Sequence, residues 1–240
     1  MDEVLEAARR RAAVEGDRRR PRRSLASAIL SARSKGLNPV IAELKLASPS
    51  GFRASVDPSE YLRAVSGAAA LSVVTEPVAF GGSYDLLRLA AESTDLPILM
   101  KDFVVSEEQL RSAVALGADA VLLITGILGE GELERLYGAA ASMGLEVLVE
   151  VHDELDLERA LALRPRMVGV NSRDLFTLRI DRGLQARLLG MIPQGIIRVA
   201  ESGIRGPDDL RALREAGADA FLVGTALMMD PGLLRELLSA

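Results

Sequence analysis

Short apolar runs of five to eight residues recur along the chain and alternate with amphipathic stretches. Runs of this length, bounded by turn residues, are typical of buried strands. They predict strands at residues 39–45, 70–76, 97–103, 120–125, 146–152, 167–173, 196–202 and 220–225. The stretches 106–118, 131–144 and 206–218 between them have helical patterns that end at a glycine, which is a common helix stop signal.

The alternation of strand and helix runs through eight cycles and predicts a parallel sheet, because parallel strands need crossover helices. Eight cycles in roughly 200 residues fit a (β/α)8 TIM barrel of the α/β class. The alternative is an open doubly wound sheet, but the Gly-x-Gly-x-x-Gly turn that would favour it is missing after the first strand. A repeated helix-Gly-strand pattern at 66–74, 116–124 and 216–224 supports closure, since the last two copies lie 100 residues apart, half a barrel.

The N-terminal residues predict helices that precede the barrel. We expect residues 1–36 to form a helical extension of one barrel domain spanning 1–240. The run Arg18–Arg23 (RRRPRR) is either a nucleic-acid patch or a solvated hinge between two helices, and the net charge of −5 favours the hinge. We find no secretory h-region and no apolar run near the ~18 residues of a membrane helix. We therefore expect a cytoplasmic protein with no membrane or nucleic-acid partner.

The composition of the chain narrows its chemistry. There is no cysteine and one histidine, His152, which excludes disulfides, thiolate metal ligands and a cysteine nucleophile and argues against a Ser-His-Asp triad. Of 29 basic residues, only Lys35, Lys45 and Lys101 are lysines. Lysine, unlike arginine, can be tuned to give up its proton, and Lys45 and Lys101 stand at predicted strand ends. Carboxylates, lysines, arginines and backbone amides therefore remain for catalysis.

Polar side chains gather at the carboxyl ends of the predicted strands, whose amino-terminal halves are almost wholly apolar. Glu43 and Lys45 face the same way if their strand is regular, since side chains alternate along a strand. The other polar ends are Glu76, Lys101, Asp102, Glu150, Asn171, Arg173, Glu201 and Ser202. In a barrel they meet at the carboxyl-terminal face, where barrel active sites lie. Rim salt bridges are an alternative for any one of them, but their number favours a shared site.

Glycines follow the last two predicted strands, in ESGI and VGTAL. Glycine lets backbone N–H groups approach an anion, and the loops after strands seven and eight are the usual phosphate site of a barrel. We therefore expect Gly203, Gly224 and Thr225 to line a phosphate site. Ser48 in the ASPSG stretch is a further candidate, although Ser, Pro and Gly also make ordinary turns.

These stretches together resemble indole-3-glycerol phosphate synthase. The resemblance runs from about residue 24 to the C-terminus, and eight motifs carry it in order: VIAELKLASPSGF, LSVVTEPVAFGGSYDLL, LPILMKDFVVSEEQL, GADAVLLIT, LEVLVEVHDELDLERAL, VGVNSRDLFTLRID, VAESGI and AFLVGTALM. The resemblance implies a (β/α)8 enzyme of tryptophan biosynthesis that needs no metal and no cofactor. Its substrate would be a phosphorylated small molecule, 1-(2-carboxyphenylamino)-1-deoxyribulose 5-phosphate, which it would convert to indole-3-glycerol phosphate, CO2 and water.

The resemblance also implies roles for residues singled out above. Lys101 in KDF corresponds to the general acid that helps the ketone accept attack by the aromatic ring, and Glu150 in VEVH to a general base. Lys45 corresponds to a second lysine that contacts the substrate carboxylate and phosphate, with Glu43 beside it. The remaining catalytic positions would be Asn171 and Glu201. Arg173, Ser202, Ser48, Gly203, Gly224 and Thr225 would bind substrate, and Phe80, Phe103, Leu122 and Ile124 would shape its aromatic pocket.

The chain departs from the family pattern at four positions near the expected site. Leu46 and Met100 stand where arginine is frequent, Ser172 where a second asparagine is common, and Thr225 where serine is usual. None of these departures removes a proposed acid or base. They bear on the phosphate site and on substrate affinity.

Two other functions compete with the synthase interpretation. A class I aldolase would use Lys45 or Lys101 to form a Schiff base with a sugar phosphate. A non-catalytic barrel would bind a phosphorylated ligand and gain stability without turnover. We expect the protein to act as a monomer or weak homodimer.

Overall fold

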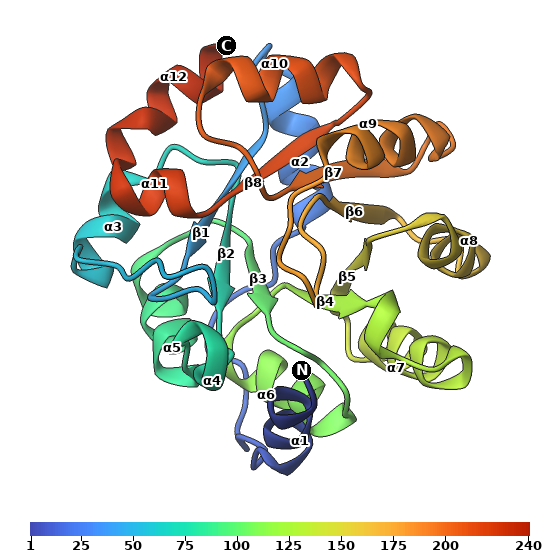
Figure 1. The fold of residues 1–240 in the computed structure, drawn as a ribbon. Coiled ribbons are helices and arrows are strands. Elements are labelled where there is room, and N and C mark those ends of the chain that lie inside the picture. The colour runs from blue at the N-terminus through green and yellow to red at the C-terminus, as the bar shows by residue number, and fades with distance from the viewer.

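The computed structural model describes residues 1–240, apart from the side chain of Glu130. Eight parallel strands form a closed barrel in the order β1 to β8, surrounded by helices (Figure 1). The strands are β1 (Val40–Leu44), β2 (Ala70–Val74), β3 (Ile98–Lys101), β4 (Ala120–Ile124), β5 (Glu146–Val151), β6 (Met167–Asn171), β7 (Ile197–Glu201) and β8 (Ala220–Val223). Because β1 pairs with β8, for example at Ile41 and Leu222, the closed barrel is confirmed and the open sheet is wrong.

Helices connect successive strands and pack around the outside of the barrel (Figure 1). They are α3 (Pro58–Ala64), α4 (Pro77–Phe80), α5 (Tyr84–Ser93), α6 (Glu107–Leu116), α7 (Glu130–Ser142), α8 (Glu154–Ala162), α9 (Arg182–Met191), α10 (Pro207–Glu215), α11 (Thr225–Met229) and α12 (Leu234–Ser239), with 3-10 turns η1 (Thr125–Ile127) and η2 (Pro231–Leu233). Helix α6 illustrates why they form where predicted. Ser106 and Gln109 make a capping box at its start, and Gly117 ends it with φ of 92°, a conformation that glycine adopts without strain.

All eight predicted strands are longer than those observed, and β3 and β8 show the reason most clearly. Strand β3 ends at Lys101, because the Asp102 carboxylate accepts the backbone N–H of Phe103 at 2.9 Å and pairs with Arg11. Strand β8 ends at Val223, and Gly224 becomes the residue before helix α11, which begins at Thr225. Both early ends place chain turns directly at the carboxyl-terminal mouth of the barrel.

The repeated GADA sequence has a structural counterpart at the amino-terminal face. Asp119 precedes β4, and its carboxylate accepts the backbone N–H of Ile98 at 3.0 Å. Asp219 precedes β8, and its carboxylate accepts the backbone N–H of Arg198, also at 3.0 Å. Each aspartate thereby ties the start of its own strand to the start of the preceding strand. The two halves of the barrel use the same fastening 100 residues apart.

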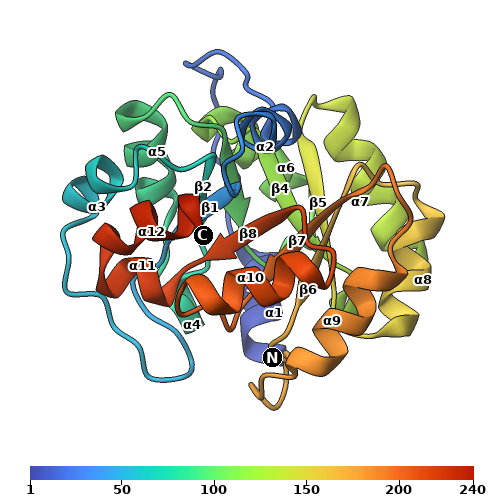
Figure 2. The same cartoon turned by 90° about the horizontal axis from the view of Figure 1, so that it is seen from above.

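The N-terminal extension runs from the mouth of the barrel to its opposite face. It contains α1 (Asp2–Arg10) and α2 (Leu25–Ser34). Just after α1, Arg11 contacts the Thr75 carbonyl and the Asp102 carboxylate at the carboxyl ends of β2 and β3. At the start of α2, Ser24 donates to Glu146 at the start of β5, with the two oxygens 2.7 Å apart. Figure 2 shows α1 and α2 on opposite sides of the barrel.

The Arg18–Arg23 run joins α1 to α2 as predicted, but only part of it is exposed to solvent. Arg18 pairs with Asp119, and the side chains of both Arg18 and Arg20 are only 9% exposed. Arg22 donates to the carbonyl oxygens of Met143 and Gly144, each at 2.6 Å. Arg18, Arg20 and Arg22 therefore attach the extension to carbonyl and carboxylate oxygens on the amino-terminal face. Sequence alone could not reveal this, because those acceptors lie about 75 to 120 residues away in the chain.

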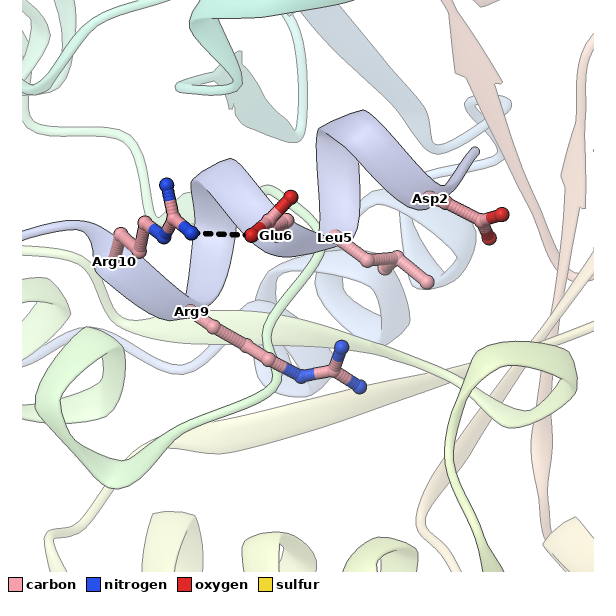
Figure 3. A pocket seen from close by; sticks show the side chains of 5 residues that line it. All are labelled: Asp2, Leu5, Glu6, Arg9 and Arg10. Carbon is pink, nitrogen blue, oxygen red and sulfur yellow. Dashed lines mark hydrogen bonds and ion pairs between the residues drawn. The ribbon is translucent and has the colours of Figure 1, made fainter.

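Helix α1 carries a pocket formed by its own side chains, Asp2, Leu5, Glu6, Arg9 and Arg10 (Figure 3). Arg10 and Glu6 form an exposed ion pair one turn apart. One helix supplies the whole lining, and no residue of a strand end contributes to it. In the part of the chain that the structure describes, no helix is long and apolar enough to cross a membrane.

Candidate active site

Four charged side chains at the mouth come from alternate strands. Glu43 lies on β1, Lys101 on β3, Glu150 on β5 and Glu201 on β7, and the three glutamates are buried. In a (β/α)8 barrel, alternate strands supply the side chains of one interior layer. Two residues earlier on the same strands are the buried apolar residues Ile41, Leu99, Leu148 and Val199. The charged groups therefore form the top of a packed interior.

Lys101 on β3 contacts the carboxylates that β5 and β7 supply. Its Nζ lies 3.1 Å from Glu150 Oε2 and 3.3 Å from Glu201 Oε2. Burial alone would lower the pKa of Lys101, but the negative charges of Glu150, Glu201 and Glu43 outweigh it and raise that pKa above its usual value. Lys101 is therefore an ammonium group over the physiological range, and it can act as a proton donor rather than as a free amine.

Glu150 is surrounded by donors. Besides Lys101, Asn171 Nδ2 donates to Glu150 Oε1 at 3.2 Å, and His152 Nε2 lies 3.2 Å from the same oxygen. Burial alone would raise the pKa of Glu150, but Lys101, His152 and Asn171 hold it well below its usual range. Glu150 is therefore ionised and can accept a proton, as a general base must.

Glu201 has the opposite character. Burial first, and then the charge of Glu150, raise the pKa of Glu201 to about 8, although Lys101 acts in the other direction. Neither carboxyl oxygen has a hydrogen-bond partner of good geometry among the described residues. The carboxyl group fits only because residue 169 on β6 is a glycine, since a Cβ there would collide with Glu201 Oε1. Two neighbouring carboxyl groups thus have pKa values moved in opposite directions, a pattern typical of acid–base sites.

Glu201→Gln is expected to stabilise the unliganded protein more at pH 9 than at pH 5. Between the unfolded pKa of 4.5 and the folded value of about 8, the native state keeps a proton that the unfolded state has lost. Native stability therefore falls as pH rises through this window. Glutamine has no proton to lose, so its advantage should grow to a few kcal/mol above pH ~8. Urea unfolding at both pH values measures this advantage, with the exposed Glu215→Gln as control. An equal gain at both pH values would contradict the assignment.

Lys45 forms a second cationic centre near β8. Its Nζ lies 3.1 Å from Glu43 Oε1 and 3.3 Å from Thr225 Oγ1. The predicted shared direction of Glu43 and Lys45 is therefore confirmed, although β1 itself ends at Leu44. Gly224 leaves the space for this pair, because a Cβ there would collide with Glu43 Oε1. Lys45, Gly224 and Thr225 thus meet at one point of the mouth.

The chain turns sharply after β7. Ser202 and Gly203 both have positive φ, 68° and 73°, and a non-glycine residue in that region is often part of a functional site. Ser172, one of the departures from the family pattern, is buried and donates from its hydroxyl to the Glu201 carbonyl at 3.3 Å. It joins the loop after β6 to the turn after β7.

Apolar side chains line the other side of the mouth. The rings of Phe80 and Phe103 lie 6.5 Å apart between centroids. Leu122 and Ile124 on β4 face the barrel interior, as Glu150 does on β5, because Ile124 pairs with Glu150 in register. Phe52 adds a further ring, whose centroid is 5.9 Å from Lys45 Nζ.

Two predicted binding residues already make contacts within their own loops. Arg173 donates from Nη1 to the Leu178 carbonyl at 2.9 Å. The Ser48 hydroxyl lies 2.8 Å from that of Ser50. Ser48 borders a hollow of about 430 Å³ between residues 47–53 and helix α4, which is on the β2 side of β1. Phosphate contact by Ser48 therefore stays a prediction.

Two polar residues at strand ends, which the sequence analysis placed with the site, stabilise the fold instead. The buried Glu76 carboxylate caps helix α4 by accepting the N–H groups of Val78 and Ala79 at 2.7 Å and of Phe80 at 3.0 Å. Asp102 pairs with Arg11, as described above. Two departures from the family pattern, Leu46 and Met100, are also separate from the four charged side chains at the mouth. Met100 is fully buried in the hydrophobic core, and Leu46 is partly buried and packs against that core.

Sequence reasoning missed two residues of the site. His152 was used only to exclude metal and triad chemistry, yet it follows Glu150 by two positions, and period-2 spacing places both on the same strand face. No sequence pattern marked Gly169, because the Glu201 side chain needs the space beside it only when β7 pairs with β6. Leaving aside the side chain of Glu130, no group of three or more His, Asp or Glu side chains is placed to hold a metal ion.

Comparisons with known proteins show the family of this chain. The family model described as indole-3-glycerol phosphate synthase matches residues 2–237. The chain is 44% identical to an indole-3-glycerol phosphate synthase of Sulfurisphaera tokodaii over 240 residues, covering 99% of this chain and 97% of that protein. Its identity to the Bordetella pertussis protein of the same name is 46%, covering 91% and 86% of the two chains.

A solved structure with low sequence identity has the same fold. Thiamine phosphate pyrophosphorylase from Pyrococcus furiosus superposes with a TM-score of 0.61 at 15% identity, covering 89% of this chain and 96% of that one. At this identity the likeness concerns the fold alone. The family model and the relatives at more than 40% identity go further. This chain belongs to the indole-3-glycerol phosphate synthase family.

Proposed function

We propose that this barrel carries out the reaction of its family with Lys101 as general acid and Glu150 as general base. As a member of that family, the chain is a carboxy-lyase of tryptophan biosynthesis. The reaction converts 1-(2-carboxyphenylamino)-1-deoxyribulose 5-phosphate to indole-3-glycerol phosphate, CO2 and water. The observation that carries the proposal is the position of Lys101 between one ionised carboxylate, Glu150, and one carboxyl group of raised pKa, Glu201.

In the first step, the ring carbon that bears the carboxylate bonds to the ketone carbon of the substrate. The ketone oxygen takes a proton from Lys101. The carboxylate then leaves as CO2, and its bonding electrons restore the aromatic ring. In the last step, Glu150 takes a proton from the five-membered ring while the hydroxyl leaves as water with a proton from an acid of the site. Acid–base help of this kind is worth about 10²–10⁴-fold in rate.

The remaining predicted residues hold the substrate. Main-chain N–H groups at Gly203 and Gly224, together with Lys45 and Thr225, suit a phosphate. Arg173 and Asn171 suit hydroxyl and carboxylate groups, and Phe80, Phe103, Leu122 and Ile124 suit an aromatic ring. A cation beside the substrate carboxylate helps only if it binds the transition state more tightly than the ground state. We expect a monomer or weak homodimer in the cytoplasm. Analytical ultracentrifugation would test the oligomeric state.

The test is fluorescence-monitored turnover of the carboxyphenylamino-deoxyribulose phosphate by the purified wild type. Appearance of indole fluorescence with release of one CO2 per product supports the proposal. A folded wild type that forms no product contradicts it. In that case, borohydride trapping of a lysine adduct would indicate an aldolase, and ligand-induced stabilisation without turnover would indicate a binding protein.

A further inference from the structure

His152, the only histidine of the chain, lies between two carboxylates. Its Nε2 is 3.2 Å from Glu150 Oε1, and its Nδ1 is 3.7 Å from Asp156 Oδ2. Its side chain is only 10% exposed. A neutral imidazole carries a proton on one nitrogen and a lone pair on the other, so one lone pair would face a carboxylate. Both contacts are favourable only when both nitrogens carry protons.

Asp156 is fixed independently of the imidazole ring. It lies in the first turn of α8, where its backbone N–H donates to Asp153 Oδ1 at 2.8 Å. Its own Oδ2 accepts the backbone N–H of His152 at 3.1 Å. Helix α8 therefore presents a buried carboxylate to the outer nitrogen of the ring. A further acid, Asp174 in the loop after β6, also experiences the charge of His152.

We propose that His152 is a positioning residue, a permanent imidazolium held by Asp156 that gives Glu150 a counter-charge independent of Lys101. The proposal rests on the acid and base roles proposed above. Lys101 is shared between Glu150 and Glu201. When Lys101 releases its proton to the substrate, it ceases to be a cation. His152 then remains as the positive partner of the buried Glu150 carboxylate.

The charge state of the ring agrees with this geometry. Burial alone would lower the pKa of His152, but Asp156 and Glu150 outweigh it and raise that pKa to about 10. A fixed cation next to Glu150 lowers the pKa values of both Glu150 and Lys101. It therefore keeps the base ionised and makes the lysine a stronger acid than it would be beside glutamates alone.

The first experiment observes His152 directly by nitrogen-15 NMR of the imidazole in the tag-free protein. Because the chain has one histidine, the signal needs no assignment. We expect both ring nitrogens to carry protons through pH 9 in the wild type. Asp156→Asn, which keeps an acceptor oxygen, should lower the midpoint by about one pH unit or more, and the exposed Glu154→Gln in the same helix turn should leave it in place. A neutral ring at pH 7 in the folded wild type would overturn the proposal.

The second experiment compares pH profiles of kcat/KM. His152→Gln removes the cation, so the pKa values of Glu150 and Lys101 should both rise and both limbs of the profile should move to higher pH, with about a tenfold loss near neutrality. His152→Lys restores a cation and should return the limbs towards those of the wild type. A lower profile with unmoved limbs would indicate a merely structural residue and refute the proposal. Failure of wild-type turnover would refute the proposed function instead, while the NMR result would still decide the charge of His152.

Discussion

Replacing Lys101 by methionine is expected to lower kcat by about 10²–10⁴-fold. Methionine fills a similar space with an apolar chain, so the change removes the ammonium group that contacts both Glu150 and Glu201. Two buried carboxyl groups then face each other without a cation between them. We expect the pKa of Glu201, already raised to about 8, to rise further, so the variant keeps its fold by protonation rather than by ion pairing.

Steady-state fluorescence turnover at saturating substrate measures this loss. Lys35→Met is the matched control, because Lys35 is exposed and lies at the end of α2, near the opposite face of the barrel. It should retain the wild-type rate. Circular dichroism and urea unfolding of both variants separate loss of chemistry from loss of structure. A folded Lys101→Met variant that still turns over at the wild-type rate would transfer the acid role to Lys45.

Replacing Glu150 by glutamine is expected to lower kcat by a similar factor, about 10²–10⁴-fold, while KM changes much less. Glutamine has nearly the same shape and can still accept the Asn171 Nδ2–H. It cannot take a proton from the substrate or remain the negative partner of Lys101 and His152. The loss should therefore fall on the chemical step, since uniform binding of substrate is largely preserved.

Glu146→Gln on the same strand is the control for this change. Glu146 lies at the opposite end of β5, where it accepts from Ser24 and Ala26. We expect the control to lose some stability and to keep the wild-type kcat. Single-turnover measurements would show whether the Glu150 variant is slowed before or after CO2 release. A rate within threefold of the wild type would mean that another group acts as the base. Glu43 is the next carboxylate to test among the charged side chains at the mouth.

The structure also bears on the aldolase alternative. A Schiff-base lysine must be a neutral amine when it attacks a carbonyl. Lys101 is held as a cation by Glu150, Glu201 and Glu43, and Lys45 is paired with Glu43 at 3.1 Å. Lys101 is therefore arranged to keep its proton until a substrate oxygen accepts it, and Lys45 is engaged in an ion pair. This arrangement favours acid catalysis over Schiff-base formation.

Much of the site could be predicted from the chain because it depends on strand order and alternation. Eight apolar runs separated by helices predicted the barrel, and the polar residue at the end of each run predicted the mouth. Glu43, Lys101, Glu150 and Glu201 meet there as expected. The prediction succeeded because the carboxyl ends of parallel strands in a barrel all lie on one face.

Other predictions failed where a side chain has a partner that is distant in sequence. Glu76 looked like a site carboxylate, but it caps α4. The Arg18–Arg23 run looked solvated, but it binds oxygens on the amino-terminal face of the barrel. A polar strand end has the same sequence pattern whether it belongs to an active site or caps a helix, and an arginine run has the same pattern whether it is solvated or bound to the barrel. Only the positions of the hydrogen-bond partners in the fold distinguish these roles.

The closed barrel, the face that carries the chemistry and the residue types available there can all be read from the amino-acid chain, because they follow from hydrophobic period, element order and composition. Which groups contact each other depends on the folded barrel. Closure brought β3 opposite β5 and β7, so that one lysine contacts two glutamates whose pKa values move in opposite directions. Barrel closure also makes glycine necessary at positions 169 and 224, because a Cβ at either would collide with a glutamate side chain. It places His152 between Glu150 and Asp156. Distances across a barrel, burial and mutual charge arise only when all eight strands are in place, and no local pattern encodes them.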